Sequence, residues 1–353
     1  MDKVSAQQWI TANLSRKLFM RGLVAVILIY ALLIGLAVLK KKDMFLSQQD
    51  RLATKTVIIE HKKDRLVFHE QQSENQAAAP SLDDFQPLAD APAEGIYQIM
   101  ENEDIVPVKS RDGSKTAFQT YRHPFDLQGS DKPYISIAIL DMGTSYAASE
   151  AALKSMPPEI SFVMSPYAPE LGLWMKESRM RGHEIWLTLP METARYPQHD
   201  TGPHTLLVEA NLVDNQRKLR WLLARPQGYV GFVTPYNATF MDSQDDMRPI
   251  FTDILERGLG FVDTRKDGFL MTENIALGLE GPYANVPVYI DMPADNRKME
   301  EKLAKIEERA IQNGAAAGFI HTLPASYDLV LKWVQSLESK GFVLAPLSAQ
   351  TGR

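Results

Sequence analysis

Four acidic residues, an arginine and a histidine follow short apolar runs in the C-terminal part of the sequence. Each run has the length of a β-strand, so these polar side chains stand where a buried strand would end. Carboxylates and an imidazole can hold a divalent metal ion such as zinc, which activates water. They can also act as general acid and base on a sugar-like substrate. The residues are Asp141 after ISIAIL, Glu192 after IWLTLPM, Asp263 and Arg265 after GFV, Asp291 after VYI, and His321 after GFI.

These residues fall into three predicted roles. Asp141, Asp263 and His321 are the candidate catalytic residues, and Asp141 and His321 are also the candidate metal ligands. An acid after a strand can instead cap the next helix, and Asp263 with Arg265 can form a local ion pair. Helix capping requires neither a histidine nor an arginine on the same rim, so the set as a whole favours a site. The candidate substrate-binding residues are Glu192, Tyr236, Asn237, Arg265 and Asp291.

Alternating strand and helix patterns from residue 132 onward must position these side chains. We expect strands at 134–140, 160–164, 184–189, 229–233, 260–262, 286–290, 316–320 and 343–345. We expect helices at 145–155, 169–181, 212–225, 243–257, 295–313 and 325–340. Such alternation implies a parallel sheet covered on both faces. A deformed (β/α)7-type barrel is the first choice and an open doubly wound sheet the second, and both collect function at the carboxyl ends of their strands.

Glycine and aspartate residues mark the expected helix ends. Gly182, Gly258, Gly314 and Gly341 each follow a predicted helix, where a left-handed residue commonly ends it. Asp295 stands where it can cap the helix that follows.

The N-terminal third of the chain lacks this alternation of strand and helix patterns. Residues 22–39 form an uncharged apolar run between Arg21 and Lys40, which predicts a single transmembrane helix over a cleaved signal peptide. Residues 1–21 are then a cytoplasmic segment, although flanking lysines and arginines on both sides leave the orientation open. Residues 40–131 are predicted to be a largely disordered spacer, because Ala, Pro, Gln and acidic residues dominate its central part. Residues 94–129 are ambiguous in the sequence, and partial order against the domain is left open for them. The folded domain is predicted at 132–348.

Composition removes several classes of function. The net charge of −6 and the lack of a basic cluster outside the membrane flanks argue against a nucleic-acid partner. The chain has no cysteine, so thiolate metal sites and cysteine nucleophiles are excluded.

Several motifs taken together resemble the divergent polysaccharide deacetylase family. They are ISIAILDMG, FVMSPYAPE, RGHEIWLTLPME, GYVGFVTPYNATF, RGLGFVDTR, VYIDMPAD and GFVLAPLSA. The resemblance implies a deformed β/α barrel and metal-dependent carbohydrate esterase chemistry. It also reveals two departures. Leu140 stands where the family has its catalytic base, and Thr188 stands where it has a histidine that binds the metal. Asp141 matches a metal ligand, and His321 matches a late histidine of the family.

The resemblance implies a membrane-anchored polysaccharide deacetylase-like protein of the bacterial envelope, with its C-terminal domain in the periplasm. The replacements at Leu140 and Thr188 predict a degenerate or altered metal site, so zinc and no cofactor are both compatible with the sequence. A non-catalytic scaffold that binds a glycan or a protein is the alternative. The sequence identifies no protein partner.

Overall fold

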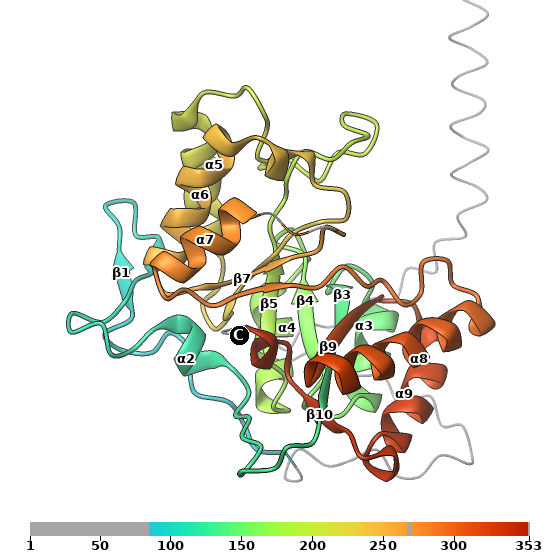
Figure 1. Cartoon of the computed structure of the whole chain (residues 1–353). Helices are drawn as coiled ribbons and strands as arrows, with labels where there is room; N and C mark the ends of the chain where they lie inside the picture. Colours follow the sequence, from blue (N-terminus) through green and yellow to red (C-terminus); the bar gives the residue numbers. More distant parts are fainter. Residues whose placement is uncertain (1–84, 267, 269, 352–353) are drawn as a thin grey trace, which may run out of the picture. The chain divides into compact units, whose positions relative to one another are not determined.

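Residues 85–266, 268 and 270–351 are described by the computed structural model of the chain (Figure 1). The predicted cytoplasmic segment 1–21, the predicted membrane span 22–39 and part of the predicted spacer, 40–84, lie outside these residues. Within the described ranges, no helix is both long enough and apolar enough to cross a membrane.

A parallel sheet of eight strands forms the centre of the described fold. Its path runs β9-β3-β4-β5-β6-β7-β8, and β10 pairs with the first residues of β3. Most of these strands are apolar throughout and buried on both sides, as parallel strands covered by helices must be. Their bounds are β3 (Tyr134–Met142), β4 (Ser161–Met164), β5 (Ile185–Thr188), β6 (Gly231–Val233), β7 (Gly260–Asp263), β8 (Tyr283–Asn285), β9 (Ala315–His321) and β10 (Val343–Ala345).

The sheet curls so that the segment after β8 returns to β9. The amide of Ile290 donates to the carbonyl of Phe319 at 2.8 Å, and the amide of Phe319 donates to the carbonyl of Val288 at 2.8 Å. The predicted strand 286–290 is therefore only a single bridge at Tyr289, while the regular strand β8 lies just before it. The α/β class is confirmed, and the curled parallel sheet fits the expected barrel.

Helices follow most strands and cover the sheet. In Figure 1, α5, α6 and α7 group on one side of the view, and α8 and α9 lie together on the other. Asp295 caps α8 by accepting from the Lys298 amide at 3.0 Å, and the predicted glycines after the helices all have positive φ. The helices are α3 (Tyr146–Ser155), α4 (Leu171–Met180), α5 (Leu212–Leu223), α6 (Gln244–Glu256), α7 (Leu270–Gly278), α8 (Asn296–Asn313) and α9 (Pro324–Ser336), with 3-10 turns η2 (Thr239–Asp242), η3 (Glu338–Lys340) and η4 (Leu347–Gln350).

Residues 85–131 are ordered, so disorder is wrong for this part of the predicted spacer, whereas the partial order left open for residues 94–129 agrees with the structure. They contain the antiparallel pair β1 (Tyr97–Ile99) and β2 (Ile105–Pro107) and the helix α2 (Ala117–Tyr121). The guanidinium of Arg179 on α4 donates to the carbonyls of Tyr121, Ala89 and Gly228. These contacts tie the segment to the domain, although its own apolar pattern is too sparse to predict order.

The buried carboxylate of Glu184 connects the segment before β3 and the C-terminal residues to the sheet. Glu184 is fully buried, and its Oε1 accepts from Ser161 Oγ at 3.1 Å, Trp186 Nε1 at 2.7 Å and the Ser348 amide at 3.0 Å. Its Oε2 accepts from the His123 amide at 3.2 Å. Four donors around one buried carboxylate offset its loss of hydration, so Glu184 belongs to the architecture.

Candidate functional site

Asp291 and His321 form a tightly coupled pair at the ends of two neighbouring segments. Asp291 Oδ1 lies 2.8 Å from His321 Nδ1, and Asp291 Oδ2 accepts from the His321 amide at 2.7 Å. The Asp291 side chain is fully buried, while about a quarter of His321 is exposed. The hydrogen bond that His321 donates to the Asp291 carboxylate raises the pKa of His321, although burial opposes the shift. The pair orients the imidazole so that Nε2 faces away from Asp291.

Asp141 lies close enough to the pair for the charges to interact. It follows the buried run of β3 and has a φ of +61°, a left-handed conformation that aspartate tolerates better than most residues. Desolvation by surrounding protein raises the pKa of its carboxyl, His321 lowers it and Asp291 raises it. Asp141 is exposed, so water screens part of this effect. Leu140 lies opposite His321 in the parallel register of β3 and β9, so Asp141 follows β3 beside the pair, and these three predicted residues form the mouth of the candidate site.

Tyr289 also lies at this mouth, although its place in the sequence does not single it out. Its ring stacks on His321 with centroids 5.9 Å apart and meets Tyr236 edge-on at 5.1 Å. Burial raises the pKa of its phenol, and the charges of Asp141 and Asp263 raise it further. An apolar run predicts that a tyrosine within it is a core residue. Only the side chains that contact this tyrosine in the folded protein show that it lies at the site.

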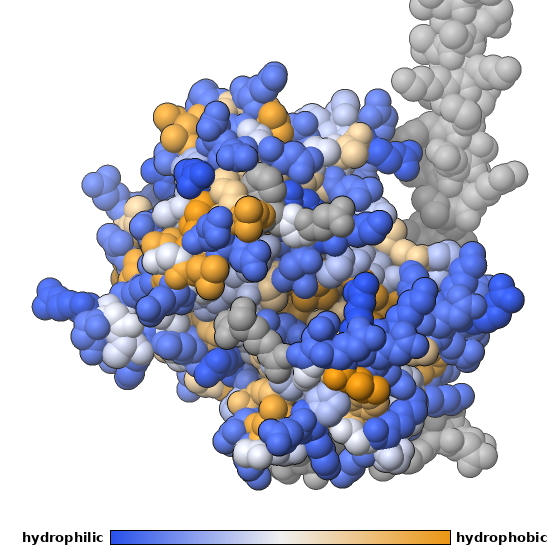
Figure 2. All heavy atoms as spheres, in the orientation of Figure 1, coloured by the Kyte–Doolittle hydropathy of each residue, from blue (hydrophilic) through white to orange (hydrophobic). Residues whose placement is uncertain are grey.

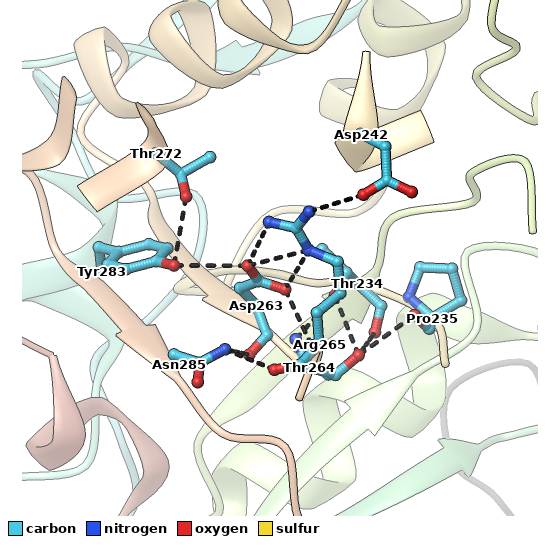
Figure 3. Close-up of polar contacts among 9 residues, drawn as sticks. All are labelled: Thr234, Pro235, Asp242, Asp263, Thr264, Arg265, Thr272, Tyr283 and Asn285. Carbon is cyan, nitrogen blue, oxygen red and sulfur yellow. Dashed lines mark hydrogen bonds and ion pairs between the residues drawn. The ribbon is translucent and has the colours of Figure 1, made fainter. Parts of the chain in front are cut away.

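Asp263 and Arg265 form a separate ion pair on β7 and the turn after it (Figure 3). Asp263 is fully buried and accepts from the Arg265 amide at 2.9 Å and from Arg265 Nη2 at 2.8 Å. Tyr283 OH donates to Asp263 at 3.4 Å, and Arg265 Nη1 reaches Asp242 at 3.2 Å. With its oxygens taken by these donors, Asp263 anchors Arg265. The geometry thus favours an anchoring role over the predicted catalytic one.

The remaining predicted residues differ in their surroundings. Glu192 Oε2 accepts from the Val208 amide at 3.0 Å, a contact that fixes the long connection after β5. Tyr236 is 48% exposed and stands over Tyr289, which suits a sugar-contacting side chain. Asn237 is exposed with a φ of +55°, and its carbonyl accepts from the Ala194 amide at 3.2 Å. Of the three, Tyr236 is the one in contact with the mouth.

The donor set at the mouth fits a zinc ion poorly. Across the described part of the chain, no group of three or more histidine, aspartate or glutamate side chains is arranged to hold a metal. Asp141 and His321 Nε2 supply two ligands, and Thr188 at the end of β5 offers only a hydroxyl. A structural or catalytic zinc site needs at least three protein ligands. The residues present therefore suit proton transfer better than metal binding.

Proton transfer is chemically reasonable for this geometry. A carboxylate with a raised pKa is a stronger base than a solvated aspartate, and a histidine held by a buried carboxylate remains protonated to higher pH. Asp141 and His321 thus offer a base and an acid at the same opening.

Comparison with known proteins gives the same family. Residues 137–351 match the model described as divergent polysaccharide deacetylase. The crystal structure of an uncharacterized protein from Agrobacterium tumefaciens is 27% identical, with a TM-score of 0.65, over 70% of this chain and 99% of that one. A family 4 carbohydrate esterase from Streptomyces lividans in complex with acetate is 13% identical, with a TM-score of 0.39, over 63% of this chain and 96% of that one. No match was found among curated proteins. On the match over residues 137–351, the chain belongs to the divergent polysaccharide deacetylase family.

Proposed function

We propose that this protein removes acyl groups from an envelope polysaccharide by acid–base chemistry between Asp141 and His321. The observation that carries the proposal is the Asp291–His321 pair, whose 2.8 Å bond holds the imidazole beside the end of β3, where Leu140 pairs with His321 and Asp141 follows. Membership of the family supports a polysaccharide as the substrate class. Tyr236 supplies an exposed aromatic ring on which a sugar ring can pack, and the buried Tyr289 connects it to His321.

The proposed reaction needs no group beyond water and these side chains. Asp141 takes a proton from a water molecule, whose oxygen bonds to the acyl carbon. The bond from that carbon to the glycan nitrogen or oxygen breaks, and His321 donates its Nε2 proton to the leaving group. Acetate and a free amine or hydroxyl result, and the proton on Asp141 returns to His321 through solvent. General acid–base catalysis of this kind contributes about 100-fold to 10,000-fold in rate.

Acetate release by the full chain tests the proposal. The substrates are chitohexaose and an O-acetylated xylan, which separate amide from ester hydrolysis. His321→Ala should reduce acetate release by about 100-fold or more if the imidazole is the acid. His199→Ala, which changes an exposed histidine on the connection after β5, is the matched control and should leave the rate unchanged. Equal rates for both variants would remove His321 from the reaction.

A non-catalytic glycan-binding role is the second candidate. The replacements Leu140 and Thr188 favour it, because they remove the base and a metal ligand that the family resemblance implies. In that case the full chain binds chitohexaose or xylan without releasing acetate, and His321→Ala changes binding little. Acetate release, measured together with binding of the same two glycans, therefore separates the two functions.

The location in the envelope is part of the proposal. The proposed anchor is the apolar run 22–39, and family membership supports a domain on the periplasmic side of the inner membrane, since the flanking charges leave the orientation open. A periplasm-specific reporter fused after Arg353 should be active in cells. A reporter that is active only in the cytoplasm would exclude envelope polysaccharide as the substrate.

A further inference from the structure

A groove of about 540 Å³ lies between α8 and the segment that precedes it. Its walls include Tyr236 and Tyr289, which lie beside the mouth of the candidate site, and Lys305 and Arg309 from α8. Asp291, which holds His321, also lies in its lining. The groove therefore borders the candidate site and runs along the middle of α8, and its volume is within the usual range for small-ligand sites.

Positive charge dominates this groove. Lys302, Lys305 and Arg309 share one face of α8 at helical spacing and all line it. Asp291 is the one carboxylate in the lining, and its oxygens are already bonded to His321.

Two of the three cations are available to a ligand. Lys302 Nζ donates to the carbonyls of Tyr289 and Met292, so it fixes the groove wall. In the part of the chain that the structure describes, neither Lys305 nor Arg309 has a carboxylate within 4.0 Å, although Glu301 and Glu308 are on the same helix. Glu301 instead lies 3.9 Å from Arg297. Figure 2 shows a hydrophilic surface over α8.

We propose that this groove binds an acidic polysaccharide strand, with Lys305 and Arg309 on its anionic groups and Tyr236 packed against a sugar ring. The inference rests on the proposed function, since it defines the class of glycan that reaches Asp141 and His321. Arginine can bind a carboxylate or a phosphate through two parallel hydrogen bonds, and lysine supplies a point charge to either anion. The strand therefore carries uronate or phosphodiester groups, and the experiment distinguishes them.

Binding of three polymers to the full chain tests the inference. Polygalacturonate carries carboxylates, poly(glycerol phosphate) carries phosphodiesters, and chitohexaose is neutral. At least one acidic polymer should bind more tightly than chitohexaose, and the tighter of the two identifies the anion. Lys305→Gln with Arg309→Gln should weaken that binding by about tenfold or more, because each loses a charge-assisted hydrogen bond.

The matched control is Arg217→Gln with Arg220→Gln, which removes the same charge from exposed positions on α5. It should leave binding of the acidic polymer within about twofold, because exposed charges at a distance are screened by salt. Equal losses in both double variants, or tighter binding of chitohexaose, would overturn the inference. The unchanged chain separates this result from the proposed reaction. Binding of the acidic polymer without any acetate release from the acetylated substrates would support the groove and contradict the reaction, and acetate release without such binding would do the reverse.

Discussion

Both oxygens of Asp291 are bonded to the same residue, His321, through its ring Nδ1 and its backbone amide. A second bond to the backbone fixes the carboxylate as well as the imidazole, so neither group can rotate away without breaking the other contact. Ser326 Oγ lies 3.4 Å from the same carboxylate and supports it from α9. The pair is thus preorganised for proton transfer at Nε2, which is the condition that general acid catalysis places on geometry.

Asp291→Asn should lower the pKa of His321, because an amide cannot stabilise the imidazolium as a carboxylate does. NMR titration of the His321 ring measures the change directly. The raised folded-state pKa means that protonated His321 stabilises the protein fully below about pH 6.5, the unfolded value. This contribution is lost as pH rises through the folded-state pKa. In Asp291→Asn that pH dependence of unfolding should disappear, whereas Asp328→Asn, an exposed control on α9, should retain it. An unchanged His321 titration would show that the pair does not set its charge.

Arg265→Ala should destabilise the fold strongly, because it leaves the buried carboxylate of Asp263 without its main partner. Removing one member of a buried ion pair costs about 3–5 kcal/mol. Chemical denaturation of the purified variant measures the loss. The control Arg217→Ala breaks an exposed pair with Asp214 and should cost no more than about 1 kcal/mol. Similar losses in the two variants would show that the Asp263 carboxylate is hydrated despite its burial.

Gly231→Ala and Gly278→Ala should have opposite effects. A Cβ on Gly231 would lie 2.1 Å from the carbonyl oxygen of Gly260, an atom of the neighbouring strand that cannot move aside. We expect Gly231→Ala to cost more than about 3 kcal/mol, above the usual range for overpacking, or to prevent folding. Gly278 has no atom within 4 Å of the added carbon, and alanine there should stabilise α7 by up to about 1 kcal/mol. Thermal unfolding of both variants measures the difference, and a tolerated Gly231→Ala would contradict the close approach of β6 and β7.

Helices with one clear apolar face were predictable from the sequence. Met299, Leu303, Ile306 and Ala310 recur at helical spacing and are all buried in α8. The helix α7 was missed because its pattern has no single buried face: Leu270 is 71% exposed and Leu277 is 68% exposed. The sequence left order within residues 94–129 open and did not predict it for residues 85–93, because a few long-range bonds, such as those of Arg179, hold the segment in place.

The candidate site was predictable only in part. The rule that function collects at the carboxyl ends of parallel strands brought Asp141, Asp291 and His321 together correctly. It could not show that Asp291 pairs with His321, because that pairing depends on which segments become neighbours. The ion pair of Asp263 with Arg265 is local, and the sequence offered it as an alternative to a catalytic role. Glu192 follows a strand as the others do, yet its carboxylate turns to the Val208 amide.

Thr188→His should add a third metal ligand to the candidate site, so that the site binds zinc. Asp141 and His321 Nε2 supply two ligands, and the family resemblance places a ligand histidine at position 188. A third ligand is the minimum for a catalytic zinc site, with water in the fourth position. Metal analysis of the full chain after dialysis against zinc should therefore give near-stoichiometric zinc in Thr188→His and far less in the unchanged protein. Thr120→His on α2 is the control for a histidine added elsewhere. Stoichiometric zinc in the unchanged protein that is lost on Asp141→Ala would show that two ligands suffice, and the reaction would then have to be reconsidered as a metal-assisted one.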